Sequence, residues 1–270
     1  MTEAQPPQPA GTDLVPVEGE RDVHGDLARA IGDITGDDHP SPAKVKDAII
    51  LAGRSAQHAG VKAVASGRWL ADIVIQTGGH LPVRDLETLR DHYDGKEGVA
   101  LAEALVRNAS RTSGAVGAAT GALVAASQLT VATWATLPIE LLAETLIVVA
   151  IELKLVAELH AVAGRPFEGT VTEKATAAAT VWSDNQGASP GTRTKIANLG
   201  FVARQAHRQL TATMQRRVLR RAGLNLWSFL PFLIGAGVGG ELNRRATLGV
   251  GRKVSHGLGL LPPAPVPPRR

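Results

Sequence analysis

The sequence contains no cysteine, only two methionines and few aromatic side chains, which make up 3% of its 270 residues. Without cysteine the chain cannot form disulfides or thiolate metal sites, and it has no cysteine nucleophile. Alanine, leucine, valine and glycine therefore supply most of the apolar residues, which still reach 44% of the chain. This composition favours closely packed helices over an aromatic-rich β-sandwich.

Acidic side chains are nearly absent from the C-terminal third of the chain. Residues 190–270 carry 14 basic side chains against Glu241 alone, a net charge of +13. Residues 1–40 carry a net charge of −7 and residues 41–189 a net charge of −2. This segregation predicts an anionic partner for the C-terminal third, either an acidic membrane surface or nucleic acid. A basic face that is merely solvated is the alternative interpretation.

Proline, glycine and acidic residues dominate residues 1–40, and no apolar period is sustained through them. We therefore expect an acidic, disordered tail over 1–40, a single helical domain over 41–260 and a proline-rich basic tail over 261–270. The first eleven residues, MTEAQPPQPAG, also lack the basic and apolar regions of a secretory signal.

Between the tails, apolar residues recur every three or four positions, which is the period of an α-helix. The sequence shows no convincing β-hairpin and no internal repeat. The pattern predicts an all-α bundle of six or seven helices, several of them rich in glycine and alanine. The predicted helical segments are residues 41–76, 83–93, 97–129, 138–163, 171–183, 192–221 and 224–248.

Two long uncharged runs raise the question of membrane insertion. No residue is charged from Thr112 to Ile139, a run of 28, or in 222–240, a run of 19. The first run is only moderately hydrophobic, because serine, threonine, alanine and glycine fill much of it. The second has arginines on both sides, whereas a simple single span concentrates basic residues on one side. We therefore favour association with an anionic membrane surface, and true spanning stays open.

The helix predicted over 138–163 is more apolar, but glutamates interrupt it. Glu140, Glu144 and Glu152 would each cost a few kcal/mol at a bilayer centre unless they were paired or faced the bundle interior. This helix is therefore expected to be an element of a protein core rather than a lone membrane span.

The stretch FLPFLIGAGVGGELNRR, residues 229–245, combines glycines with arginines. Gly235 and Gly239 within it, like Gly117 and Gly121 in the earlier run, have the G-x-x-x-G spacing that lets helices approach closely. Basic residues near an anionic leaflet each add roughly 1 kcal/mol of attraction. The predicted headgroup contacts are the arginines that flank the second uncharged run, namely Arg216, Arg217, Arg220, Arg221, Arg244 and Arg245.

Two motifs with chemical associations lack the context that they need. The glycines of GAGVGG, residues 235–240, spell the dinucleotide-binding pattern G-x-G-x-x-G. However, Pro231 interrupts the strand that should precede it, and no acidic residue follows Glu241 to bind a ribose. Residues 187–191 spell G-x-S-x-G, but the residue after the serine is a proline without the N–H that an oxyanion hole requires.

We find no catalytic constellation, cofactor site or metal site in the sequence. The eight histidines are scattered without metal-ligand spacing. Glu140 and Glu144 lie four apart and could hold a metal ion or a proton, although pairing with an arginine from another helix is the more ordinary role. The basic segment 192–221 could contact phosphates, but it lacks a helix-turn-helix and stacking aromatics, so nucleic acid is not the expected partner.

Two segments resemble the paired signature regions of the EcsC-like bacterial proteins. Residues 137–164 form a proline-led apolar helix that ends at a glycine, and residues 229–254 place a glycine-basic segment after a glycine helix. The family order of proline, two glycines and an asparagine is matched by Pro231, Gly235, Gly239 and Asn243. The resemblance covers about residues 100–258, and ATWAT replaces the family's glycine-rich lead into the first helix. It implies a helical protein, genetically associated with a transporter operon, without established enzymatic activity or catalytic residues to carry over.

Together these patterns predict a non-enzymatic accessory or scaffold protein that binds an anionic membrane surface. It would lie at the cytoplasmic face of a bacterial inner membrane, peripheral or partly inserted, with a membrane protein such as a transporter as a conceivable further partner. No cofactor is expected. A soluble, cytoplasmic helical interaction module and an undetected hydrolase stay open as alternatives.

Overall fold

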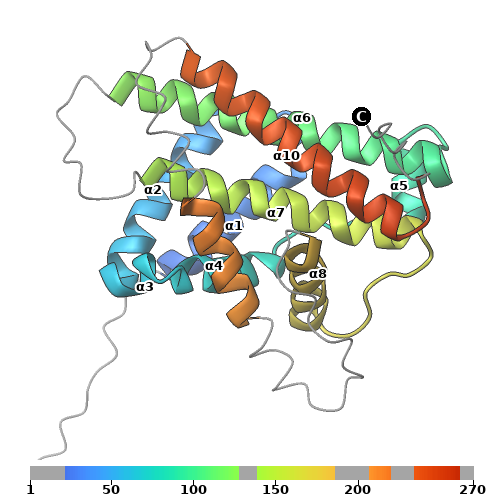
Figure 1. The fold of residues 1–270 in the computed structure, drawn as a ribbon, viewed down its shortest axis with the longest axis horizontal. Coiled ribbons are helices and arrows are strands. Elements are labelled where there is room, and N and C mark those ends of the chain that lie inside the picture. The colour runs from blue at the N-terminus through green and yellow to red at the C-terminus, as the bar shows by residue number, and fades with distance from the viewer. Residues whose placement is uncertain (1–21, 128–138, 186–206, 220–233, 262–270) are drawn as a thin grey trace, which may run out of the picture.

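The computed structural model describes residues 22–127, 139–185, 207–219 and 234–261. These described residues fold into ten α-helices joined by turns and contain no strand, so the predicted all-α class is confirmed (Figure 1). The helices are α1 (Val23–Gly36), α2 (Pro42–Ala59), α3 (Val61–Ala65), α4 (Arg68–Gly78), α5 (Leu86–His92), α6 (Gly98–Ser127), α7 (Ile139–Val162), α8 (Val171–Asn185), the helix formed by residues 207–219, and α10 (Ile234–Gly257).

Helix α1 occupies part of the segment that was predicted to be a disordered tail. The side chain of Asp22 caps its first turn, accepting a backbone hydrogen bond at 2.9 Å. Leu27 and Ile31, four residues apart, are buried against the rest of the core, and the helix packs on α2 and α4. The tail prediction was therefore wrong from Val23 onward. The apolar residues of α1 are few and lie among glycines and acids, so they form no sustained period in the sequence. Residues 1–21 lie outside the described residues.

The single helical segment predicted over 41–76 is divided into three helices. Gly60 (φ 81°) and Gly67 (φ 73°) take backbone conformations that other residues rarely adopt, and each lies where one helix ends and the next begins. The short helix α3 between them therefore forms a corner, with the side chain of Val61 projecting into solvent. These two breaks are one reason why the described residues contain more helices than the six or seven predicted.

Helix α7 lies at the centre of the molecule and is covered on all sides. It contacts α1, α2, α4, α5, α6, α8 and α10, and nearly every side chain between Leu141 and Leu159 is buried. Burial at the centre of the bundle accounts for the mainly apolar sequence of α7. This is the place in a protein core that its glutamates predicted. Across the described ranges, no helix combines the length and the apolar composition that crossing a bilayer demands.

Helices α6 and α10 run antiparallel and pack along much of their length at the top of Figure 1. A Cβ atom added to Gly117 would lie 2.7 Å from the carbonyl oxygen of Gly239, so the two backbones are in direct contact. Gly117 and Gly239 thus face each other, as expected of packing glycines. Gly121 is half-buried in α6, and Gly235 lies in the first turn of α10. Residues 220–233, which include the predicted start of this helix, lie outside the described residues.

Candidate functional site

Arg217, one of the predicted headgroup contacts, points into the protein instead. Its guanidinium donates two hydrogen bonds to the carboxylate of Glu152, at 2.7 and 3.0 Å, and lies over the ring of Trp182. The Arg217 side chain is 14% exposed and that of Glu152 is 0% exposed. A buried carboxylate needs a cation and hydrogen-bond donors, and Arg217 supplies both. The predicted headgroup contact therefore does not hold for Arg217 in this structure.

The carboxylate of Glu152 in α7 binds side chains from three other helices, and a fourth, α6, is reached through Thr247. Besides Arg217 from the helix 207–219, Trp182 of α8 donates its indole N–H at 2.7 Å. The hydroxyl of Thr247 in α10 lies 3.0 Å from Glu152 and 2.9 Å from the hydroxyl of Ser113 in α6. We call Ser113, Glu152, Trp182, Arg217 and Thr247 the Glu152 cluster. Each carboxylate oxygen has donors, so the cluster is a satisfied structural network between helices.

The predicted contacts Arg244 and Arg245 both bind an acid on their own helix. Each donates to Glu241, one turn earlier in α10, and these hydrogen bonds lower the pKa of Glu241 to about 2. The three side chains together carry only one net positive charge. Arg220 and Arg221, also predicted contacts, lie outside the described residues.

Arg216 lies on a different surface, where the α3 corner meets the helix 207–219. The two elements touch, because a Cβ atom added to Gly67 would lie 3.2 Å from the carbonyl oxygen of Thr211. We define the corner surface as six exposed side chains, namely Val61, Lys62, Arg68, Arg208, Arg216 and Leu219. Within the described ranges, none of its four cations forms an ion pair with an acidic side chain.

The corner surface also carries the two most exposed large hydrophobic side chains of the described residues. Val61 is 85% exposed and Leu219 is 60% exposed. The helix 207–219 is also linked to α4 by Asp72, whose carboxylate binds His207 at 2.8 Å. Exposed cations and exposed apolar side chains on two touching elements are suited to binding an anionic, partly apolar surface.

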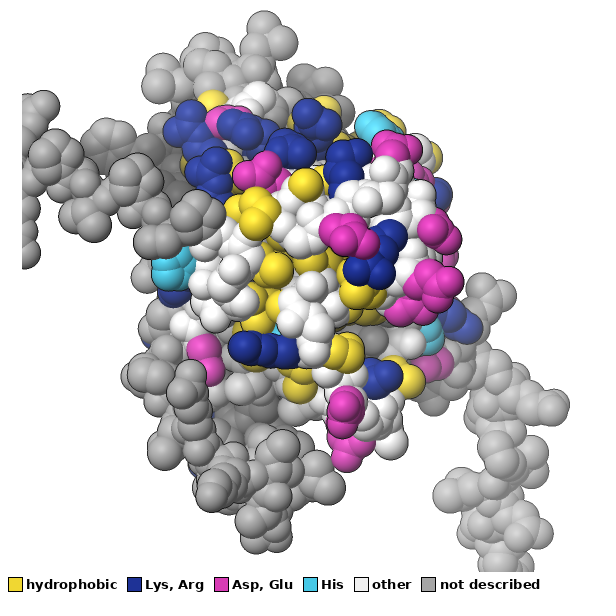
Figure 2. All heavy atoms as spheres, turned by 90° about the vertical axis from the view of Figure 1, so that its right-hand side faces the viewer, with side chains coloured by type: hydrophobic (Ala, Val, Ile, Leu, Met, Phe, Trp, Pro, Cys, Tyr) yellow, Lys and Arg dark blue, Asp and Glu magenta, His cyan; other side chains and the backbone are white. Residues whose placement is uncertain are grey.

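The opposite end of the molecule has a different charge pattern. Figure 2 views the right-hand side of Figure 1, where basic and acidic side chains lie next to one another. Lysine and arginine side chains gather at its upper edge, the side on which α6 and α10 lie, and acidic side chains lie among them. Helix α6 itself carries an exposed ion pair between Arg107 and Glu103. Opposite charges in such proximity leave less net attraction for an anionic partner.

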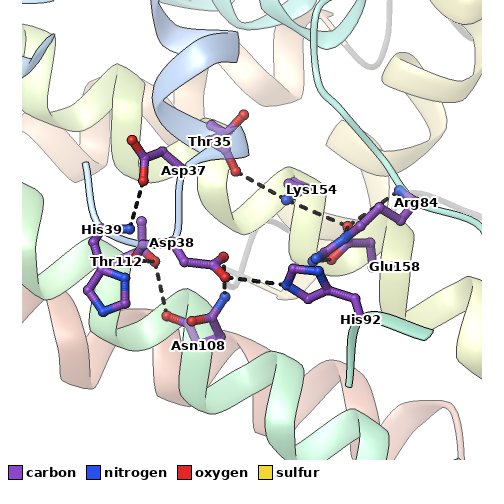
Figure 3. Close-up of polar contacts among 10 residues, drawn as sticks. All are labelled: Thr35, Asp37, Asp38, His39, Arg84, His92, Asn108, Thr112, Lys154 and Glu158. Carbon is purple, nitrogen blue, oxygen red and sulfur yellow. Dashed lines mark hydrogen bonds and ion pairs between the residues drawn. The ribbon is translucent and has the colours of Figure 1, made fainter. Parts of the chain in front are cut away.

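A second polar cluster forms where the α1–α2 and α4–α5 connections meet α5, α6 and α7 (Figure 3). Arg84 donates to both carboxylate oxygens of Glu158, at 2.8 and 3.0 Å, and Glu158 is 3% exposed. Lys154 lies 3.7 Å from Glu158 and donates to the carbonyl oxygen of Thr35 at 3.1 Å. Burial lowers the pKa of Lys154 against the opposing effect of Glu158. These contacts tie α7 to the N-terminal helices.

Asp38 forms the other half of this cluster. Its carboxylate accepts from Asn108 at 2.7 Å and contacts His92 at 3.4 Å, and its carbonyl oxygen accepts from Thr112 at 3.2 Å (Figure 3). Burial alone would raise the pKa of Asp38, but the hydrogen bonds from Asn108 and His92 outweigh it and lower the pKa. Beside Asp38, the Asp37 carboxylate accepts from the backbone N–H of His39. We call the residues drawn in Figure 3 the Glu158 cluster.

A cavity of about 20 Å³ opens between Asp38, Arg84, Tyr93 and Lys154. This volume suits about one water molecule and is far too small for an organic substrate. The hydroxyl of Tyr93 is buried and has no hydrogen-bond partner among the described residues, and burial raises its pKa. Two acids and two cations balance one another around the cavity. The arrangement is that of a structural ion-pair network rather than a substrate pocket.

Neither of the two glutamates considered for a metal or a proton stands in a ligand cluster. Glu144 is buried and accepts a hydrogen bond at 2.5 Å from Asn243 of α10, and Glu140 is half-buried in the first turn of α7. Among the residues that the structure describes, no group of three or more histidine, aspartate or glutamate side chains is arranged to hold a metal ion.

Most residues of the two clusters could not be singled out from the sequence. In the sequence, Glu152 stands out only for its cost in a bilayer. No motif includes Arg84, Asp38, Trp182 or Thr247. The one usable signal was the presence of charged residues on a continuously apolar helix, which requires partners wherever that helix is buried. The partners on other segments lie 30 to 119 positions away in the sequence, so only the tertiary fold identifies them.

Comparisons of the chain with protein-family models, with curated proteins and with solved structures found no match.

Proposed function

We propose that this chain is a non-enzymatic accessory or scaffold protein that binds an anionic membrane surface peripherally, at the cytoplasmic face of a bacterial inner membrane. The observation that carries the proposal is the corner surface, which combines the exposed Val61 and Leu219 with four exposed cations that pair with no acidic side chain among the described residues. Four basic residues near an anionic leaflet would contribute roughly 4 kcal/mol of attraction. Burying the two apolar side chains at the interface adds about 1.5–3 kcal/mol for each one that is fully covered.

The resemblance of residues 100–258 to the EcsC-like bacterial proteins supports the same proposal. That resemblance implies a helical protein with a genetic link to a transporter operon, so a transporter in the same membrane is the further partner that we propose. The glycine interface between α6 and α10 would act within the protein, holding its helices together, rather than as a contact with another chain.

Fractionation of bacterial cells that express the full chain tests this function. A peripheral protein held by charge should pellet with membranes at low salt and leave the pellet in high salt or in carbonate, because salt screens exposed charges. Carbonate resistance would show insertion instead. Complete recovery in the supernatant at low salt would contradict membrane association and favour a helical interaction module free in the cytoplasm.

A further inference from the structure

The helix 207–219 has two sides of opposite character. Its inner side buries Leu210, Met214 and Val218 in the core, whereas its outer side presents Arg208 and Arg216 to solvent. An isolated helical segment as short as residues 207–219 is marginal in water and depends on an apolar surface for its stability. Either the core or the boundary between lipid headgroups and acyl chains provides such a surface.

We infer that the helix 207–219 detaches from the bundle on an anionic membrane and lays its apolar side into the lipid surface, with Arg217 joining Arg216 as a headgroup contact. This inference rests on the proposed function, since the corner surface must first bring the helix to the membrane. Docking of the helix would regulate the same surface, because the docked helix keeps one arginine and three apolar side chains away from the lipid.

Among the described residues, two side chains of this helix make polar contacts with the rest of the bundle. His207 binds the exposed carboxylate of Asp72 at 2.8 Å. Arg217 binds the buried Glu152 at 2.7 Å. Anionic headgroups compete with Glu152 for Arg217, whose side chain is 14% exposed and which follows the exposed Arg216 in the sequence.

The Glu152 cluster is arranged so that the departure of Arg217 leaves the carboxylate hydrogen-bonded. Trp182 donates to one oxygen of Glu152 and Thr247 to the other, so each oxygen keeps a donor from a helix that stays in place. Water entering the vacated groove would hydrate the charge that Arg217 had compensated. If Arg217 were the sole partner of Glu152, its departure would leave a buried charge without any hydrogen bond. The cost of that unpaired charge would oppose detachment of the helix.

A disulfide that locks the helix in place provides the test. A Cβ atom added to Gly67 would lie 3.5 Å from the Cβ atom of Gln215, within the range of natural disulfides. Because the chain has no cysteine of its own, the double variant Gly67→Cys and Gln215→Cys forms only this bond. The same protein before and after reduction gives a matched pair, and the single variant Gln215→Cys controls for the oxidising treatment.

Binding to vesicles that contain 30% phosphatidylglycerol is measured for both forms. If the helix detaches, the oxidised form should bind at least tenfold more weakly than the reduced form, and the reduced form should bind like the wild type. Equal binding of the two forms, with the wild type bound as well, would overturn detachment and leave the proposed function standing. Failure of the wild type to bind would contradict the proposed function itself.

Gly67 has a φ of 73°, so a cysteine at this position carries backbone strain and the double variant could misfold. A second measurement therefore uses the wild-type chain. Hydrogen exchange of the wild-type chain is followed with and without the same vesicles. Detachment predicts at least tenfold faster exchange in the α8 segment around Trp182, whose ring lies under the guanidinium of Arg217. Unchanged exchange there, on membrane-bound protein, would overturn it.

Discussion

At the scale of single residues, buried charges decide how this protein holds together. Glu152 is fully enclosed, yet it receives hydrogen bonds from an indole, a hydroxyl and a guanidinium on three other helices. Glu158 is almost as deeply buried and is bound by Arg84 through two hydrogen bonds. Each acid binds an arginine, Arg217 or Arg84, that would otherwise be free on the surface. The buried glutamates therefore determine which arginines remain available for a partner.

Truncating Glu152 should destabilise the protein severely. Glu152→Ala leaves Arg217 and the Trp182 indole without an acceptor in a buried place, and the loss of one partner of such a pair costs about 3–5 kcal/mol. Urea denaturation followed by circular dichroism measures the change in unfolding free energy. Glu140→Ala, at the half-buried start of the same helix, is the matched control and should change stability far less. A loss below about 1 kcal/mol for Glu152→Ala, close to the effect of a surface substitution, would show that the ion pair is unimportant.

The lowered pKa of Asp38 predicts a pH dependence of stability. Because the folded pKa of Asp38 lies below its unfolded value of 3.8, its carboxylate stabilises the fold above that pH. The contribution is lost as the pH falls through the folded pKa. Asp38→Asn should therefore unfold at lower urea than the wild type at pH 7, and the two midpoints should converge as the pH falls through the folded pKa of Asp38. The exposed Asp47→Asn is the control. A midpoint difference that stays constant with pH would contradict the role given to this carboxylate.

At the scale of helices, the apolar period of the sequence was sufficient to predict the bounds of a helix wherever a long apolar pattern ran without interruption. The segments predicted over 138–163 and 171–183 correspond to α7 (Ile139–Val162) and α8 (Val171–Asn185) within two residues at each end. Helix α1 was missed because its few apolar residues are stabilised by packing on α2 and α4, which the composition of its own segment does not reveal. The breaks at Gly60 and Gly67 were missed because glycine is also tolerated within helices, and only the tertiary arrangement selects the left-handed conformation.

The contact between α6 and α10 predicts opposite effects of alanine at two glycines. In Gly117→Ala the new Cβ atom would lie 2.7 Å from the carbonyl oxygen of Gly239, so the helices must separate, at a cost of about 1–3 kcal/mol. Gly249 in α10 is exposed, and a Cβ atom added there meets nothing within 4 Å. Gly249→Ala should therefore stabilise the helix by up to about 1 kcal/mol. Thermal unfolding of both variants compares them directly. Equal effects of the two substitutions would mean that the backbones do not touch.

At the scale of the whole molecule, the distribution of unpaired cations could not be obtained from the sequence. The charge segregation indicated the C-terminal third, and the flanks of residues 222–240 indicated particular arginines. The structure shows that Arg217 is enclosed and that Arg244 and Arg245 share Glu241. Arg216 instead joins cations from α3 and α4, far from it in sequence. The proposed membrane contact is therefore an assembly of distant segments, which a pattern along the chain cannot reveal.

Titration of the chain with anionic vesicles tests membrane binding through the corner surface most directly. The corner variant carries Lys62→Glu, Arg68→Glu, Arg208→Glu and Arg216→Glu. A control variant reverses the same number of exposed charges elsewhere, at Arg111, Arg165, Lys174 and Arg252. We expect the wild type and the control variant to bind within a few-fold of each other. The corner variant should bind more than tenfold more weakly, and binding of the wild type should weaken steeply with salt. Equal loss of binding in both variants, or no binding of the wild type to anionic vesicles at low salt, would contradict a membrane contact at the corner surface.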